Sequence, residues 1–232
     1  MAPPSVSRET LPRWLSAGQR RQLDAVLAVL ESDEHAPTAI REAGRAAEVH
    51  IADSLGALDL GALADADRIV DLGSGAGFPG APIAIALPHA KVTLVESQRR
   101  RCEFLERMCT AAGIANARVV WTRAEAWREG RCRHDAALAR ALAPQPVVLE
   151  YAAPLLRVGG TLIDWRGRRS PEQEGAAERA AAALGLCRVE MRHMTPFPGA
   201  SDHHLHVFAK VGRTPARFPR RPGIARKRPL GA

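Results

Sequence analysis

The sequence predicts an α/β fold in which a mostly parallel sheet carries helices on both faces. Five strand–helix units follow one another along the chain, an order typical of parallel sheets. The 232 residues are 46% hydrophobic, which is enough to bury the core of one such domain. We expect a helical extension over 1–62, the α/β domain over 63–212 and a basic tail over 213–232.

Two amphipathic helices are expected ahead of the sheet. The first, over 17–31, repeats apolar residues at i, i+3, i+4 and i+7, namely Leu23, Val26, Leu27 and Leu30. The second spans about 42–58 and takes its apolar contacts from Val49, Ile51, Leu55 and Leu58.

Strands and helices alternate through the body of the chain. Strands are expected at 68–73, 91–97, 117–122, 134–140, 161–167, 187–194 and 203–211. Helices are expected at 80–87, 98–112, 143–157 and 172–185. Gly113 is placed to end the second of these helices as a C-terminal cap. Because no helical pattern separates the last two strands, they should pair as an antiparallel hairpin.

Targeting and redox features indicate a cytoplasmic protein. The opening MAPPSVSRETLPRW lacks the apolar core of a signal peptide, and no run of about 20 apolar residues suits a membrane span. The four cysteines form no CxxC pair, and two lie seven apart on a predicted helix. This favours buried thiols over disulfides or a zinc site. They are Cys102, Cys109, Cys132 and Cys187.

The glycine-rich stretch VDLGSGAGFPG, residues 70–80, predicts a ligand site after an apolar strand. A dinucleotide fingerprint needs a third glycine where this chain has Phe78, and no GK[ST] follows as in a phosphate loop. Gly73, Gly75 and Gly77 allow a ligand to approach the backbone closely without placing a pyrophosphate there. S-adenosylmethionine is such a ligand.

Glu96, at the end of the second strand, is the expected ribose partner of this ligand. It lies twenty-five residues after Asp71, and a carboxylate there can accept both ribose hydroxyls. The alternative is an ordinary acid at a strand end.

Several segments together resemble one family. DLGSGAGFPG, VTLVES, RAEAW, LARALAP and a closing FPRRPGIARKRPL are similar to the bacterial small-subunit ribosomal RNA guanine-N7 methyltransferases, known as glucose-inhibited division protein B. HIADSL, residues 50–55, resembles the HxxDSL segment of that family. The likeness covers about 36–230. Where the family usually has Asn-Leu-Thr, this chain reads Ala36, Pro37 and Thr38, which suggests a divergent branch.

The resemblance implies a Rossmann-like class I methyltransferase fold with a seven-stranded sheet. It implies methyl transfer from S-adenosylmethionine to N7 of a guanosine in 16S ribosomal RNA, with ribosomal RNA or the small ribosomal subunit as partner. The donor site implied by the resemblance and the glycine turn comprises Gly73, Gly75, Phe78, Glu96, Ala124, Glu125 and Arg140. These positions follow strand ends, where open α/β sheets bind ligands. Arg140 should point at the donor's carboxylate or at RNA, or else form a structural ion pair.

The acceptor chemistry agrees with N7. The fourth strand ends in Ala139-Arg140-Ala141-Leu142, without the Asn-Pro-Pro-Tyr type of motif that enzymes acting on exocyclic amines tend to carry. No cysteine is well placed as a nucleophile for cytosine carbon 5. Guanine N7 has a free lone pair and loses no proton before attack, so no catalytic residue is assigned. The alternatives are an RNA-binding protein of this fold with weak activity, or a methyltransferase for another acceptor.

The tail from Arg213 carries seven basic residues and no acid, against a net charge of +8 for the chain. Four prolines exclude a regular helix or a central strand. Such a tail suits a phosphate backbone, and we favour an RNA clamp that adds little to the core. The alternatives are a solvated end, or a tail anchored by Phe218 that closes the donor site. The RNA-binding candidates are His50, Asp53, Arg166, Arg220, Arg221, Arg226 and Lys227.

Two polar clusters stay open. Trp165-Arg166-Gly167 either binds nucleic acid or is a buried tryptophan with a surface arginine. His204 and His206 share one strand face, which we read as a polar face near the RNA, and we expect no metal there.

Overall fold

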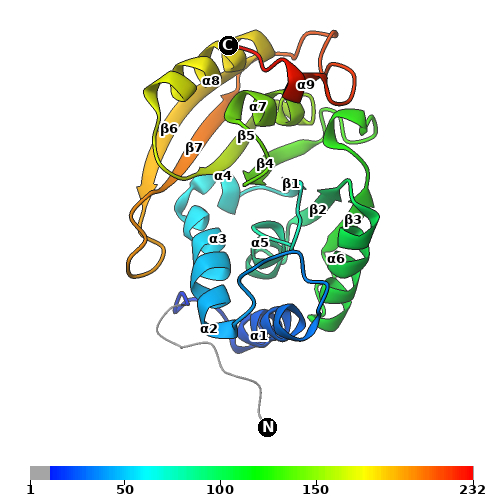
Figure 1. Ribbon diagram of the computed structural model, residues 1–232, viewed down its shortest axis with the longest axis vertical. Helices are drawn as coiled ribbons and strands as arrows, with labels where there is room; N and C mark the ends of the chain where they lie inside the picture. Colours follow the sequence, from blue (N-terminus) through cyan, green and yellow to red (C-terminus); the bar gives the residue numbers. More distant parts are fainter. Residues whose placement is uncertain (1–10, 232) are drawn as a thin grey trace.

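The computed structural model describes residues 11–231 and contains a seven-stranded sheet with helices on both faces (Figure 1). The strand order is β3-β2-β1-β4-β5-β7-β6. β1 to β5 run parallel, and β7 is antiparallel to β5 and β6, as expected. The strands are β1 (Arg68–Leu72), β2 (Lys91–Glu96), β3 (Ala117–Trp121), β4 (His134–Arg140), β5 (Leu156–Arg166), β6 (Leu186–Met194) and β7 (His203–Lys210). The fold class predicted from the sequence is confirmed.

Each face of the sheet buries its own apolar core. On one face lie α1 (Ala17–Ser32), α5 (Gly80–Ala86) and α6 (Arg99–Ala111) with the N-terminal helical segment. The other face carries α7 (Gln145–Ala152), α8 (Pro171–Leu184) and α9 (Ile224–Lys227). The three leucines and one valine that predict the first helix are all fully buried in α1.

The expected helix over 42–58 forms, but with changes of winding along its length. α2 (Ala43–Ala46) continues as a π-helix over Ala47–Ala52, then as α3 (Asp53–Leu55) and a 3-10 turn over Gly56–Asp59. α4 (Gly61–Ala64), which the sequence did not predict, follows before β1. π-turns occur often at functional sites, and this one contains His50.

The expected boundary between α7 and β5 was wrong. The sequence predicts a helix to 157 and a strand from 161, whereas α7 ends at Ala152 and β5 begins at Leu156. Pro154 cannot continue the helix, and Leu156 then pairs with His134 at the start of β4. Other boundaries agree to within about two residues.

The basic tail packs on the body of the protein, so the expectation that it adds little to the core was wrong. Phe218 and Ala225 are 6% and 3% exposed and belong to the core beside α7 and α8. The prolines do exclude a long helix, but no proline interrupts Ile224–Lys227, which forms the single turn α9.

Two further expectations concern the cysteines and the membrane. Cys102 and Cys109 are buried on α6, as predicted, and burial raises the pKa of each thiol to about 11. Cys132 and Cys187 are exposed, so the prediction of buried thiols was wrong for these two. Between residues 11 and 231 there is no helix of the length and apolarity that crossing a bilayer needs.

Candidate functional site

The glycine turn joins β1 to α5 at the carboxyl edge of the sheet. Gly73 has φ +67°, and its N–H and that of Ser74 both donate to the Val95 carbonyl of β2. Gly80 lies so close to Asp71 that an added Cβ would approach the carboxylate oxygen to 2.6 Å. The Gly80 N–H donates to Asp71 Oδ2, which ties the start of α5 to β1. Close packing at both ends therefore shapes this turn.

Glu96 is buried at the end of β2 and faces the glycine turn. Its Oε1 accepts hydrogen bonds from the N–H groups of Ser97 and Gln98, at 2.6 and 2.8 Å. Its Oε2 accepts from the Gly75 N–H at 3.1 Å. Because a carboxylate offers about four lone-pair sites, Oε2 can still accept one more hydrogen bond. The side chain fits a role at the edge of a nucleoside site.

A small cavity of about 70 Å³ opens beside this turn. Three of the expected donor-site residues line it, namely Gly73, Ala124 and Glu125. The cavity is small because Leu142 lies over Gly73, where its Cδ1 is 2.5 Å from the position of an added Cβ. Small-molecule sites usually measure about 300–1,000 Å³, so a nucleoside-sized ligand requires Leu142 to move.

Leu142 follows a strained position at the end of β4. Ala141 has φ +52°, in the left-handed region that residues other than glycine rarely adopt. Strained backbone of this kind gathers at ligand sites and switch segments. The loop after β4 is therefore the part of the site most suited to rearrange.

The tail forms one wall of the small cavity. The Gly223 N–H donates to Glu125 Oε1 at 3.2 Å, and Arg226 Nη2 donates to the Leu142 carbonyl at 3.0 Å. Arg226 also lines the cavity beside Tyr151 of α7. The tail thus contacts both sides of the cavity.

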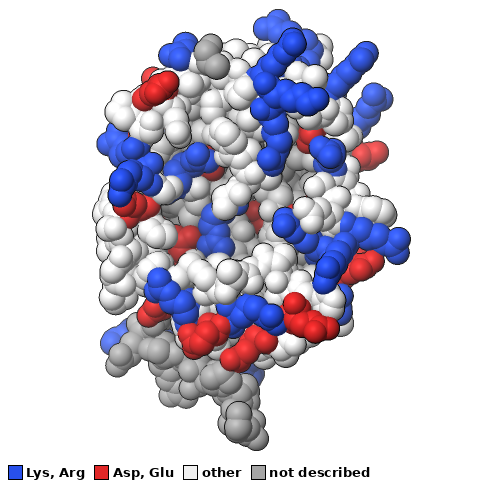
Figure 2. All heavy atoms as spheres, viewed as in Figure 1, with Lys and Arg blue, Asp and Glu red and all other residues white. Residues whose placement is uncertain are grey.

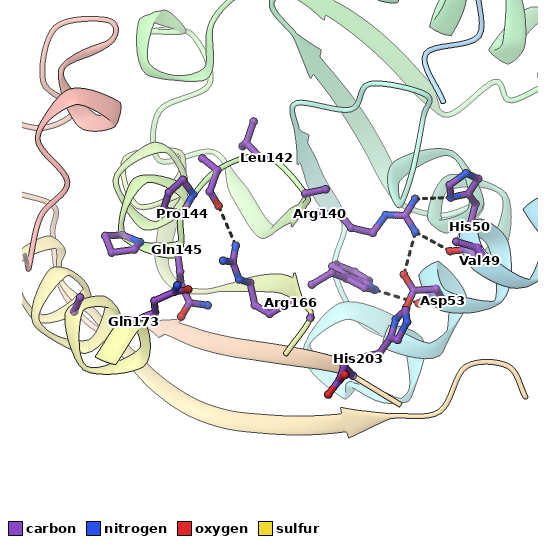
Figure 3. Close-up of a pocket in the computed structure, with 17 residues that line it drawn as sticks. Val49, His50, Asp53, Arg140, Leu142, Pro144, Gln145, Arg166, Gln173 and His203 are labelled. Atoms are coloured by element: carbon purple, nitrogen blue, oxygen red, sulfur yellow. Dashed lines mark hydrogen bonds and ion pairs between the residues drawn. The ribbon is translucent and has the colours of Figure 1, made fainter. Parts of the chain in front are cut away.

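A second, larger cavity of about 830 Å³ lies at the carboxyl ends of β4 and β5 (Figure 3). Its walls come from the π-helix, the loop after β4, the end of β5, α8 and the loop before β7. Leu142 lines this cavity as well as the small one, so the two cavities share a wall. Other lining residues are His50, Asp53, Arg140, Gln145, Trp165, Arg166, Gln173 and His203.

Arg140 joins the N-terminal segment to the sheet at the wall of the large cavity. Its Nη1 donates to Asp53 Oδ2 at 3.0 Å and to the Val49 carbonyl at 3.2 Å. Its guanidinium lies over the Phe78 ring, 5.6 Å from the centroid. Asp53 is 3% exposed, and its Oδ1 lies 3.1 Å from His203 Nδ1. Arg140 was expected to point at the donor's carboxylate or at RNA, or else to form a structural ion pair. The structure shows the ion pair, with Asp53 (Figure 3).

His50 is neutral and held in one tautomer. Burial and the Arg140 guanidinium lower the pKa of His50 from 6.5 to about 4. Arginine can only donate, so Nδ1 accepts from Arg140 Nη2 at 3.1 Å. Nε2 therefore carries the proton and donates to Thr38 Oγ1, also at 3.1 Å. The ring stacks on Phe78 with centroids 4.6 Å apart.

The structure separates the expected donor-site residues into two groups. Gly73, Ala124 and Glu125 line the small cavity. Beside it, the Gly75 N–H donates a hydrogen bond to Glu96. Arg140 lines the large cavity instead, and the Phe78 ring contacts His50 and Arg140. The donor-binding roles of these residues stay predictions.

The expected RNA-binding residues also divide. Arg220 is paired: its Nε and Nη2 donate to the carboxylate of Glu150, whose side chain is 1% exposed, and RNA binding by Arg220 stays a prediction. Arg221, Arg226 and Lys227 are exposed. Arg166 is half-buried, and its Nη1 donates to the Ala143 carbonyl at the wall of the large cavity.

His50 and Asp53 are buried, so a nucleotide can reach them only through the large cavity. Trp165 is 6% exposed and donates from Nε1 to the Asp53 carbonyl, as the buried-tryptophan alternative has it.

The reading of His206 as part of a polar face near RNA was wrong. His206 is 3% exposed, and its Nδ1 lies 3.2 Å from Gln145 Oε1. The Gln145 amide in turn donates to Asp164, whose pKa is raised by burial to about 7. Over residues 11–231, no set of three or more His, Cys, Asp or Glu side chains is grouped to hold a metal ion.

Sequence reasoning did not find Leu142, His203 or Thr38. No local sequence pattern marks Leu142 or His203 as site residues, because each lines a cavity whose walls are brought together only by folding. Thr38 could have been found, because it is the residue that remains of the family's usual Asn-Leu-Thr and it holds the His50 ring.

Fold and site together define a class I methyltransferase, in which a parallel sheet carries a glycine turn, an acid after the second strand and a cavity at the end of the fourth. A family model described as rRNA small subunit methyltransferase G matches residues 23–203. The chain belongs to this family, as the resemblance seen in the sequence indicated.

Individual proteins agree with this assignment. The chain is 34% identical over 229 residues to ribosomal RNA small subunit methyltransferase G of Synechococcus elongatus, covering 96% of this chain and 95% of the relative. Identity to the protein of the same name from Rubrobacter xylanophilus is 40% over 187 residues, covering 78% and 72%. Fibrillarin of Aeropyrum pernix, solved with natively bound S-adenosyl-L-methionine, has a TM-score of 0.53 at 21% identity, covering 68% of this chain and 73% of its own.

Proposed function

We propose that this protein transfers a methyl group from S-adenosylmethionine to N7 of a guanosine in 16S ribosomal RNA. The observation that carries the assignment of the sites is that the small and the large cavity share the Leu142 wall. A donor at the glycine turn and a base in the large cavity would meet there. Both lie at the carboxyl edge of the sheet, where such folds bind ligands.

The small cavity is the donor site of this proposal. S-adenosylmethionine supplies a methyl group carried on a sulfonium. The turn at Gly73 lets the ligand's amino-acid end approach the backbone, and Glu96 Oε2 has a lone pair free for a ribose hydroxyl. Leu142 moves aside when the donor binds, and the tail closes the site from the outside through Gly223 and Arg226.

The large cavity is the acceptor site. A cavity of about 830 Å³ admits a guanine with its sugar and phosphate. Methylation at N7 turns the base into a cation, which an unpaired arginine would oppose. Arg140 is paired with Asp53, and the lining also holds Arg166 and Asp202, so the formal charges of these four side chains balance and do not oppose the new cation.

No side chain has to act as a base in this reaction. The N7 lone pair is free in neutral guanine, so the site contributes alignment and exclusion of water. His50 agrees with this assignment, because both of its ring nitrogens are already engaged by Arg140 and Thr38. An rRNA substrate also places the enzyme in the bacterial cytoplasm.

The test is methyl transfer from labelled S-adenosylmethionine to 16S rRNA that lacks the modification, both free and within small ribosomal subunits. The rRNA is digested to nucleosides, and the labelled nucleoside is identified by mass spectrometry. We expect the label in 7-methylguanosine. Label in a methylated exocyclic amine, in 5-methylcytidine or in a ribose would overturn the assignment, as would the absence of transfer to either substrate.

A further inference from the structure

An exposed tryptophan lies at the carboxyl edge of the sheet, outside both cavities. Trp121 is the last residue of β3 and is 61% exposed, whereas Trp127 and Trp165 are each 6% exposed. A single exposed apolar residue needs no explanation by itself. The contacts and neighbours of Trp121 are those of a binding surface.

The Trp121 ring is fixed in place. Its Nε1–H donates to the Ser97 carbonyl at 3.1 Å, and the Arg99 guanidinium lies 5.7 Å from the ring centroid. An aromatic side chain held in this way loses little conformational entropy when a ligand stacks on it. The guanidinium lies over the ring, so the two planar groups occupy one place on the surface.

The position of Trp121 connects it to the donor cavity. It pairs with Glu96 across the two strands, and its hydrogen-bond acceptor Ser97 lines the cavity at the glycine turn. Two residues further on, Arg123 lines the same cavity. An RNA whose target base occupies the large cavity can extend across this edge.

Basic residues begin the helix after β2 and follow β3 close to Trp121 in the chain. Arg99, Arg100 and Arg101 open α6, and Arg123 follows β3. Figure 2 shows Lys and Arg side chains gathered on this side of the molecule, and a further group over the tail. Arg99 also pairs with Glu103, but both side chains are exposed and such pairs contribute little. One aromatic ring among arginines suits nucleic acid better than an apolar protein surface.

We propose that Trp121 and Arg99 form a stacking platform for an unpaired base that flanks the methylated nucleotide in the RNA substrate. Sequence-specific and single-stranded RNA recognition uses such stacking on aromatic rings and guanidinium planes. The inference rests on the proposed function in taking RNA as substrate, but it does not depend on which atom is methylated. Trp121 is a binding residue here and takes no part in the transfer.

The experiment compares Trp121→Ala, Trp121→Phe and Trp14→Ala in equilibrium binding of unmethylated 16S rRNA. Trp14 is 57% exposed and precedes α1, more than one hundred residues before Trp121 in the chain. Its replacement by alanine therefore removes a similarly exposed tryptophan outside the proposed platform. We expect Trp121→Ala to weaken RNA binding about 5- to 150-fold, the range found for one base stacked on an aromatic ring. Trp121→Phe should keep most of the affinity, and Trp14→Ala all of it.

Kinetics and fluorescence give independent readouts. Trp121→Ala should raise KM for RNA and leave kcat at saturating RNA, because the platform binds substrate without touching the reacting atoms. In a Trp14→Phe background, RNA should quench emission, and adding Trp121→Phe should reduce that quenching to what Trp165, in the wall of the large cavity, contributes. This second readout does not require the alanine variant to fold.

Two results would overturn the platform: RNA binding of Trp121→Ala that matches Trp14→Ala, or quenching that is as large without Trp121 as with it. A wild-type protein that binds RNA through Trp121 yet forms no 7-methylguanosine would refute the proposed function and leave the platform standing.

Discussion

At the scale of single residues, Arg140 is the group that joins the N-terminal segment to the catalytic sheet. It binds Val49 and His50 of the π-helix and Asp53 of α3, and it covers Phe78 from the glycine turn. The sequence marks both HIADSL and Arg140 as candidates. It does not show that they touch, because about ninety residues separate them and only the fold brings them together.

The pKa of His50 leads to a prediction for the pH dependence of stability. The folded value of about 4 is below the 6.5 of the unfolded chain. The neutral histidine therefore contributes stability that is fully present above about pH 6.5 and is lost as the pH falls through about 4. We expect the difference in unfolding free energy between wild type and His50→Gln to rise with pH by up to about 1.4 kcal/mol per unit in that interval.

Other buried groups titrate in the same range, so the comparison with His50→Gln isolates the contribution of His50. His206 also has a pKa lowered to about 4 by burial, which adds to the effect. Asp71 and Asp164 have pKa values raised by burial to about 6 and about 7, which act in the opposite sense. Denaturant unfolding of both proteins at several pH values gives the difference. A constant difference across the interval would contradict the neutral, buried state of His50.

At the scale of elements, the tail is the part whose packing the sequence misjudged. Composition shows seven basic residues and four prolines, which favour an extended RNA clamp. The packing of Phe218 and the pairing of Arg220 with Glu150 depend on α7, more than sixty residues earlier. The charge composition of the tail does not show that a buried acid, Glu150, pairs with one of its arginines.

Deletion of 213–232 should lower both stability and donor affinity. The deletion exposes the core around α7 and leaves Glu150 buried without its arginine. Breaking a buried ion pair costs about 3–5 kcal/mol of unfolding free energy. It also removes Gly223 and Arg226 from Glu125 and Leu142, so calorimetry should show weaker binding of S-adenosylmethionine.

A matched control separates this role from RNA binding. Arg221 and Lys227 are exposed, so replacing both with alanine should leave the melting temperature and donor affinity nearly unchanged. If they bind phosphates, the slope of log affinity for RNA against log salt should flatten by roughly 1.4. A truncated protein with wild-type stability and donor affinity would show that the tail does not close the site.

At the scale of the whole molecule, the fold followed from patterns that are local. Alternating apolar strands and amphipathic helices predict the sheet, and the missing helix before β7 predicts the hairpin. The glycine turn and Glu96 came from the same local reading. The large cavity did not, because its walls come from five separate parts of the chain that meet only after folding.

The proposed reaction requires N7 as the acceptor atom, and one substitution in the RNA tests this. In 16S rRNA transcribed with 7-deazaguanosine, each N7 is replaced by a C–H group that has no lone pair. Its methylation is compared with that of the ordinary transcript, both free and assembled into small subunits. We predict that the deaza RNA still binds the protein but accepts no methyl group, while the ordinary RNA accepts up to one per molecule. Equal methylation of the two RNAs would contradict the proposed function.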